Sequence, residues 1–75
     1  MSEEVRSGAL VVVLGDVLRA EIAADPTMTE LPRVRDIAET YGAARPTVVA
    51  VLRALAAEGL IEARPGDRWT VTGRP

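Results

Sequence analysis

The sequence predicts a small α+β domain that is mostly α-helical and carries a β-hairpin at its C-terminal end. Three segments before Gly59 have apolar residues at helical spacing, and the pattern changes to strand-like alternation after Gly59. With 75 residues the chain has room for one domain, which we expect to span residues 1–75. The hydrophobic residues, 48% of the chain, are nearly all aliphatic, so aliphatic packing has to form the core.

The first predicted helix covers residues 3–24, with Ser2 as its N-cap and Asp25-Pro26 as its end. One broad apolar face comprises Val5, Leu10, Leu14, Val17, Leu18 and Ile22. Residues 11–13, three consecutive valines, widen this face beyond what a domain of this size needs. Two interpretations remain open: the rest of the domain encloses the helix, or the helix also pairs with a second copy.

A connector over residues 25–32 precedes the second predicted helix, and residues 27–31 could form a short strand within it. The second helix is expected from Pro32 or Arg33 to Tyr41, because proline suits a first helical turn. Its apolar positions are Val34, Ile37, Ala38 and Tyr41. Gly42 ends it, as glycine commonly does at this position.

A tight turn over residues 43–45 leads into the third predicted helix, which begins at Pro46 and ends near Glu58. Glycine in the next position stops it. The residues that this helix is expected to bury are Val48, Val51, Leu52 and Leu55.

Two strands are predicted at residues 60–64 and 68–72, joined by Pro65-Gly66-Asp67. An isolated two-stranded hairpin is marginally stable, so it has to lie against the helices, and Trp69 is expected to pack there. This order of elements predicts a winged helix-turn-helix fold, with the helix-turn-helix at residues 32–58 and the wing at residues 60–72.

The composition argues against an enzyme. The chain contains no cysteine and no histidine, and its two serines, Ser2 and Ser7, lie near the N-terminus. A nucleophile with its base, or a common metal site, cannot be assembled from what remains, so we expect no catalysis, metal or cofactor. The longest apolar run is too short to cross a bilayer, and acidic residues at positions 3 and 4 do not fit a signal peptide. We therefore expect a cytoplasmic protein.

The charge of the chain is unevenly distributed. The overall net charge of −2 disfavours a nucleic-acid ligand, because phosphate contacts dominate such binding. However, residues 31–75 carry seven arginines against five acids, a net charge of +2, whereas residues 1–30 carry two arginines against six acids, a net charge of −4. A DNA-binding face would have to lie in the C-terminal part.

The segment from Leu31 to Val71 resembles the DNA-binding domain of the GntR family of bacterial transcription regulators. The spacing is unbroken from Leu31 to Gly66. The matching residues are Leu31-Pro32, Arg35, Ile37-Ala38-Glu39, Gly42, Arg45, Thr47-Val48, Leu52, Leu55, Glu58-Gly59-Leu60-Ile61, Pro65-Gly66 and Val71. The resemblance implies that the third helix enters the major groove of double-stranded DNA and that the wing lies near the minor groove.

The resemblance also assigns DNA contacts to individual residues. It places Arg35 and Arg45 on DNA, Thr47 on a phosphate or base, and Gly66 at the minor groove. Docking geometry adds the remaining candidates, which are Arg33, Val49, Arg53, Arg64 and Arg68. Each arginine could instead be a solvated charge or an ion-pair partner, as Arg35 could be with Glu39.

Several positions depart from the family pattern. Val49 stands where the family usually has a second recognition-helix arginine, and Ala44 replaces a serine that would cap the helix. Arg33 occupies another serine position, Arg68 replaces the second wing glycine, and Asp67 brings a negative charge to the wing tip. These departures concern the base sequence that is read, and Val49 and Ala50 could pack against thymine methyl groups.

Most family members carry a large effector-binding domain after the wing. Because this chain ends at Pro75, it is either a free-standing regulator without such a domain or an excised domain, and we expect the former, associated with the nucleoid. Family members act as dimers, so a homodimer is expected, and the first helix could contact a second copy or another protein. The alternative function is a winged helix that contacts proteins without binding DNA, which the acidic total and the apolar Val49-Ala50 surface favour.

Overall fold

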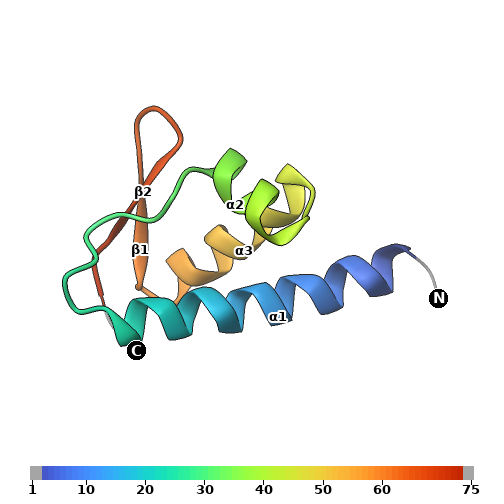
Figure 1. The fold of residues 1–75 in the computed structure, drawn as a ribbon, viewed down its shortest axis with the longest axis horizontal. Coiled ribbons are helices and arrows are strands. Elements are labelled where there is room, and N and C mark those ends of the chain that lie inside the picture. The colour runs from blue at the N-terminus through green and yellow to red at the C-terminus, as the bar shows by residue number, and fades with distance from the viewer. Residues whose placement is uncertain (1–2, 74–75) are drawn as a thin grey trace.

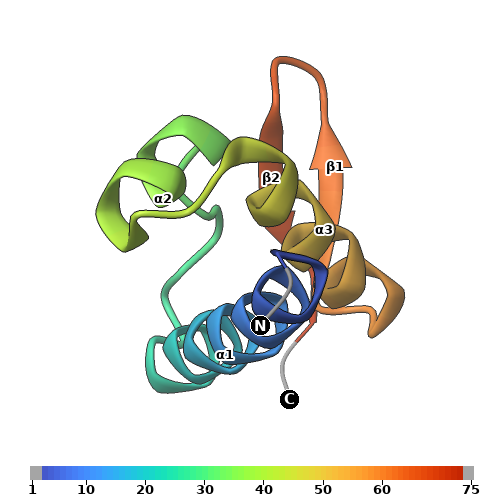
Figure 2. The same cartoon turned by 90° about the vertical axis from the view of Figure 1, so that its right-hand side faces the viewer.

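The computed structural model describes residues 3–73, and the side chains from residue 8 onward. The elements are α1 (Glu3–Ala24), α2 (Val34–Tyr41), α3 (Arg45–Ala57), β1 (Ile61–Arg64) and β2 (Arg68–Val71). Figures 1 and 2 show α1 along one side of α3, with α2 and the hairpin on the opposite side. Three helices followed by an antiparallel hairpin confirm the predicted winged helix-turn-helix fold.

The predicted bounds of α1 are confirmed, and its inward side matches the predicted apolar face. Leu14, Leu18 and Ile22 are buried, and Leu10 and Val17 are partly buried. The Ser2 cap and the side chain of Val5 lie outside the described residues.

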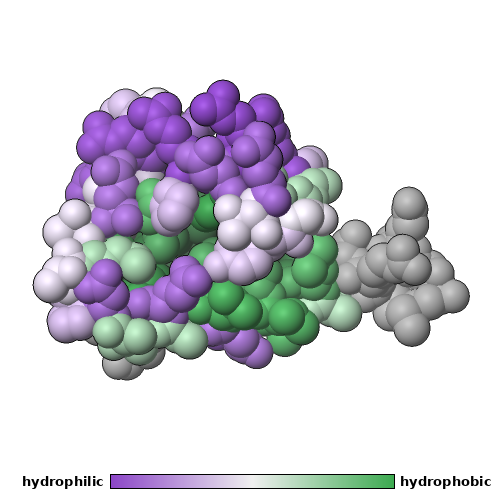
Figure 3. Space-filling view, viewed as in Figure 1, coloured by the Kyte–Doolittle hydropathy of each residue, from purple (hydrophilic) through white to green (hydrophobic). Residues whose placement is uncertain are grey.

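The three valines of α1 divide between the core and the solvent. Val11 packs against the core, but Val12 and Val13 are 63% and 59% exposed. Figure 3 shows the resulting contrast, with hydrophobic surface over α1 and hydrophilic surface over the wing and α2. The rest of the domain therefore encloses only one side of α1.

The start of α2 differs from the prediction, because Pro32 lies before the helix. Arg33 is the N-cap residue with extended backbone angles, and its carbonyl accepts the first helical bond, from the N–H of Ile37 at 3.0 Å. Gly42 ends the helix as predicted. Its φ of 63° lies in the left-handed region, where glycine carries no Cβ penalty.

Helix α3 also begins one residue earlier than predicted. Ala44 is its N-cap, Arg45 is its first residue, and Pro46 is its second residue, so Arg45 belongs to the helix and not to the turn. Backbone N–H groups in the first turn of a helix have no intrahelical acceptor. Proline, which lacks an N–H, therefore fits the second position of a helix as well as the first. The helix ends at Ala57, with Glu58 as its C-cap.

The two strands of the hairpin are each one residue shorter than predicted. Ile61 pairs with Val71 and Arg64 pairs with Arg68 across the antiparallel ladder. Beyond the ladder, the N–H groups of Thr72 and Gly73 donate to the carbonyl of Leu60 at 3.0 and 3.1 Å.

The connector between α1 and α2 joins the base of this hairpin. The short strand that residues 27–31 could form is reduced to a single bridge, which pairs Glu30 with Thr70. The N–H of Leu31 donates to Trp69, and the N–H of Val71 donates to Thr29, both at 2.9 Å. Earlier in the connector, the N–H of Thr27 donates to the carboxylate of Asp25 at 3.0 Å. The connector therefore covers the outer edge of β2 over a very short distance.

Helix α3 lies at the centre of the core. All four of its predicted core residues are buried. Those that surround them from other elements are Leu14, Leu18, Ile22, Leu31, Ile37, Leu60 and Ile61. Trp69 packs against this cluster, as predicted. Because the inward side of α3 is fixed in this way, its outward side has a defined direction.

Candidate nucleic-acid interface

The outward side of α3 carries a row of residues one helical turn apart. Arg45 and Arg53 are exposed, and Val49 between them is partly buried. Residues four apart on a helix lie on the same side, about 6 Å apart along the axis. Ala50 is exposed beside Val49. The row therefore presents two positive charges with an apolar segment between them.

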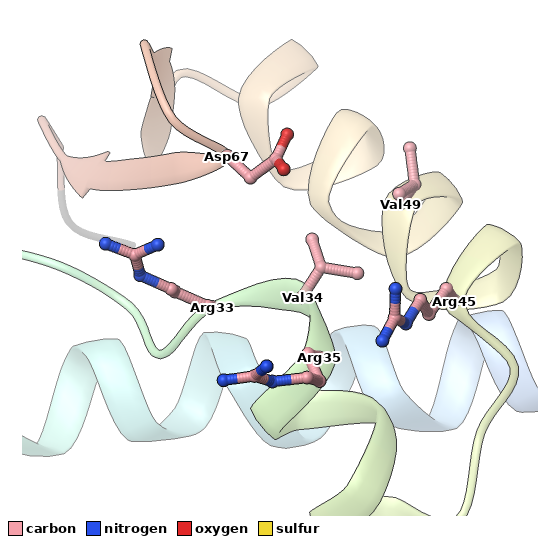
Figure 4. Close-up of a pocket in the computed structure, with 6 residues that line it drawn as sticks. All are labelled: Arg33, Val34, Arg35, Arg45, Val49 and Asp67. Atoms are coloured by element: carbon pink, nitrogen blue, oxygen red, sulfur yellow. The ribbon is translucent and has the colours of Figure 1, made fainter.

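A cleft of about 400 Å³ lies between the start of α2, the start of α3 and the wing tip. Figure 4 shows the side chains that line it, with Val34 among the arginines. The lining residues are Arg33, Val34, Arg35, Arg45, Val49 and Asp67. Four of the nine predicted site residues are thus brought together, although they come from separate parts of the chain.

The arginines around this cleft are not engaged with acids. Among the side chains that the structure describes, none forms an ion pair or side-chain hydrogen bond with Arg33, Arg35, Arg45 or Arg53. The Arg35–Glu39 pair that was an alternative for the sequence is therefore not formed. Their positive charges remain available to an anion in the cleft or on the adjoining surface.

The two wing arginines are held differently. Arg68 donates from Nε to the carboxylate of Glu30 at 2.7 Å, and this hydrogen bond raises the pKa of Arg68 above its ordinary value. Arg64 donates to Glu62 at 3.4 Å and to the hydroxyl of Thr70 at 3.2 Å. Both arginines were predicted to face DNA, and in this structure an acid offsets each charge.

The beginnings of both helices lack side-chain caps. Neither Arg33, the N-cap of α2, nor Ala44, the N-cap of α3, makes a side-chain cap hydrogen bond. Backbone N–H groups in a first turn have no intrahelical acceptor, and the positive end of the helix dipole favours an anion there. Thr47 lies in this first turn of α3 and is partly buried. Both helix ends thus add positive potential beside the cleft.

The wing tip turns through two consecutive left-handed residues. Gly66 has a φ of 79°, and Asp67 has a φ of 57°. Glycine adopts this conformation freely, and aspartate is one of the few other residues that tolerate it. Asp67 therefore satisfies the turn while placing its carboxylate in the cleft with the arginines.

Two polar contacts fix the helix-turn-helix relative to α1. Arg19 donates to both carboxylate oxygens of Glu58, at 2.9 and 2.6 Å, and also contacts Asp16 at 2.8 Å. The hydrogen bond from Arg19 holds the pKa of Glu58 below its ordinary value. At the other end, the hydroxyl of Tyr41 donates to Glu21 at 2.8 Å, which raises the tyrosine pKa.

Sequence reasoning missed three residues that line the cleft or hold one of the candidate arginines. Val34 lines the cleft but was assigned only to the core, and Asp67 was noted as a charge but not as part of the site. Glu30 was counted in the acidic part of the chain, yet it reaches Arg68 across the sheet. No local pattern marked Glu30, because a single bridge with Thr70 brings it to the sheet.

Within residues 3–73, no helix is both long and apolar enough to cross a membrane. The same residues contain no group of three or more carboxylates, histidines or cysteines that could hold a metal ion.

Comparisons with known proteins agree with this geometry. The family described as "Bacterial regulatory proteins, gntR family" matches residues 13–71, from the middle of α1 to the end of the wing. An uncharacterized HTH-type transcriptional regulator of Mycobacterium bovis and the HTH-type transcriptional regulator Mce2R of Mycobacterium tuberculosis are each 45% identical over 56 residues. Those residues are 75% of this chain and 22% of each relative. The chain belongs to the gntR family of bacterial regulatory proteins.

Proposed function

We propose that this chain binds double-stranded DNA sequence-specifically as part of a bacterial transcription regulator at the nucleoid. The observation that carries the proposal is the convergence of three arginines, Arg33, Arg35 and Arg45, on one cleft without an acidic partner among the described side chains. Backbone phosphates are the natural ligands for such a cluster beside two helix beginnings. The name HTH-type transcriptional regulator, which both relatives carry, supports the same function.

In this proposal the beginning of α3 enters the major groove. Arg45 then reaches a base edge, and Arg53, which lies further along α3, contacts a base or a phosphate. Thr47 and the two arginines at the start of α2 contact phosphates. Gly66 allows the wing tip to approach the minor groove, and Arg64 and Arg68 contribute less because acids offset their charges.

A binding titration at two salt concentrations tests this proposal. About three arginine–phosphate contacts for each copy give a slope of log affinity against log salt of about −2.7. Fluorescence anisotropy with a labelled duplex, at 50 and 200 mM salt, measures that slope. A chain that binds no duplex at either concentration contradicts the proposal and favours the alternative, a module that contacts proteins.

We further propose that two copies bind together through the outward side of α1. Its exposed residues Ala9, Val12, Val13 and Ala20 leave apolar surface in contact with water, which a second copy of α1 would bury. A symmetric pair also brings two helix-turn-helix units to half-sites about 34 Å apart and doubles the phosphate contacts.

Val12→Asp tests this pairing, because a charge is costly in an apolar contact and harmless in water. Analytical ultracentrifugation with and without duplex DNA measures the mass, and Val12→Thr is the uncharged control. We expect the aspartate variant to stay monomeric with an unchanged circular dichroism spectrum. A wild-type chain that is monomeric in both conditions, and binds as one copy per site, contradicts the proposal.

A further inference from the structure

On the outward side of α3, the apolar side chain of Val49 lies between the charged side chains of Arg45 and Arg53. Val49 is partly buried and lines the cleft, with exposed Ala50 beside it. The helix itself has the sequence RPTVVAVLRALAA, which contains no acidic residue and no amide side chain. The side chains of Val49 and Ala50 themselves can neither donate nor accept a hydrogen bond.

An apolar surface of this kind is selective toward base edges. In the major groove, guanine and adenine present hydrogen-bonding atoms that lose water when they face a valine, which is unfavourable without a new partner. Thymine alone among the four bases presents a methyl group there. A valine pressed against thymine buries apolar surface on both sides instead of stranding a polar atom.

We propose that Val49, with Ala50 beside it, selects a thymine in the major groove through its C5-methyl group. This inference rests on the proposed DNA binding and adds the chemical class of base that the middle of α3 reads. Arg45, about 6 Å nearer the beginning of the helix, would face a base about two steps away, since successive base pairs are about 3.4 Å apart. Guanine is the base that arginine reads best.

The test begins with a duplex selected from a randomised pool by the wild-type chain. Each thymine of that duplex is then replaced in turn by deoxyuridine, which removes the methyl group and leaves base pairing intact. We expect one position in each half-site to lose about fourfold in affinity, the change that corresponds to burying one methyl group. The other thymine positions of the same duplex are the internal controls.

The variant Val49→Ala assigns the effect to its residue. If Val49 holds the methyl group, the alanine variant binds the thymine and uridine duplexes with nearly equal affinity, because the two changes remove the same contact. The matched control is Ala57→Ser, which alters an exposed residue in the last turn of α3 and should keep the fourfold difference. Val49→Arg should shift the preference at that same base pair from thymine toward guanine.

The outcomes separate this inference from the function on which it depends. A chain that binds duplex DNA with the expected salt slope but shows no uridine-sensitive position overturns the inference alone. An undiminished uridine penalty in Val49→Ala, or a changed preference at a different base pair in Val49→Arg, also overturns it. A chain that binds no duplex fails the proposed function and the inference together.

Discussion

The helix-turn-helix and the wing both carry exposed arginines, but the surroundings of those arginines differ. Arg33, Arg35 and Arg45 face a common cleft without an acid paired to them among the described side chains. In the wing, Glu30 and Glu62 each hold an arginine, and Asp67 adds a further negative charge at the tip. The number of arginines on an element therefore does not measure the attraction of that element for phosphate.

The comparison explains how a chain with net charge −2 can hold DNA. Electrostatic attraction depends on the local field at the contact, and salt screens charges that are more than about 10 Å away. Asp67 lines the cleft and cancels part of the field there, whereas the acidic residues of α1 and the wing partners Glu30 and Glu62 do not line it. We infer that the helix-turn-helix supplies most of the affinity and the wing supplies little.

The largest difference is expected between Arg45→Ala and Arg68→Ala. Loss of a good arginine–base contact costs about 1–3 kcal/mol, so we expect Arg45→Ala to weaken binding at least about tenfold. Arg68→Ala should weaken it less than about threefold, because Glu30 already offsets its charge. Anisotropy titrations give both affinities, and circular dichroism checks the fold. Equal losses in the two variants would remove the distinction between the two regions.

Glu30→Gln should make Arg68 of the wing available to bind phosphate. Without the carboxylate at 2.7 Å, Arg68 can reach phosphate, and we expect binding about threefold tighter at low salt. The salt slope should steepen by up to about one unit. Asp16→Asn makes the same charge change on α1 and is the control. Unchanged affinity in Glu30→Gln would show that the wing arginine lies away from DNA.

Asp67→Asn should have a smaller effect in the same direction. Asparagine tolerates the left-handed turn, so the wing tip should keep its shape while losing one negative charge. We expect binding about twofold tighter at low salt, with no change in the preferred sequence. Titration of the selected duplex and of a scrambled duplex measures both effects. No change at low salt would place the wing tip away from the DNA.

Glu58→Gln should leave DNA binding unchanged and alter only the stability of the domain. Since Arg19 holds the pKa of Glu58 below its ordinary value, the folded state gains stability above that value and loses it as the pH falls through the lowered pKa. Thermal unfolding at pH 7 and pH 3 measures this, with Glu39→Gln as the control. We expect the variant to melt below the wild type at pH 7, and the difference between the two to shrink at pH 3.

The architecture was predictable because its signals are local. Helical spacing, a glycine after each of α2 and α3, and a turn sequence between two alternating segments placed every element within about two residues. Both helix beginnings were misplaced by one or two residues for a shared reason. Proline fits several positions in a first turn, so Pro32 and Pro46 could not by themselves identify the first residue of a helix.

The electrostatics of the site were less predictable than its position. Arg33, Arg35, Arg45 and Val49 could be assigned to one surface from the family resemblance together with the docking geometry of the helices. The pairing of Arg68 with Glu30 joins residues 38 apart in the sequence, through a bridge that is too short to leave a strand pattern. Whether an arginine is free or neutralised depends on such distant neighbours, which no local pattern records.

The bridge between the connector and β2 has a mechanical consequence. Its hydrogen bonds at Thr29 and Leu31 clamp the base of the hairpin only two residues before Arg33, the N-cap of α2. A tilt of the hairpin would therefore displace the beginning of α2. The bridge thereby ties the position of the wing to that of Arg33 at the cleft.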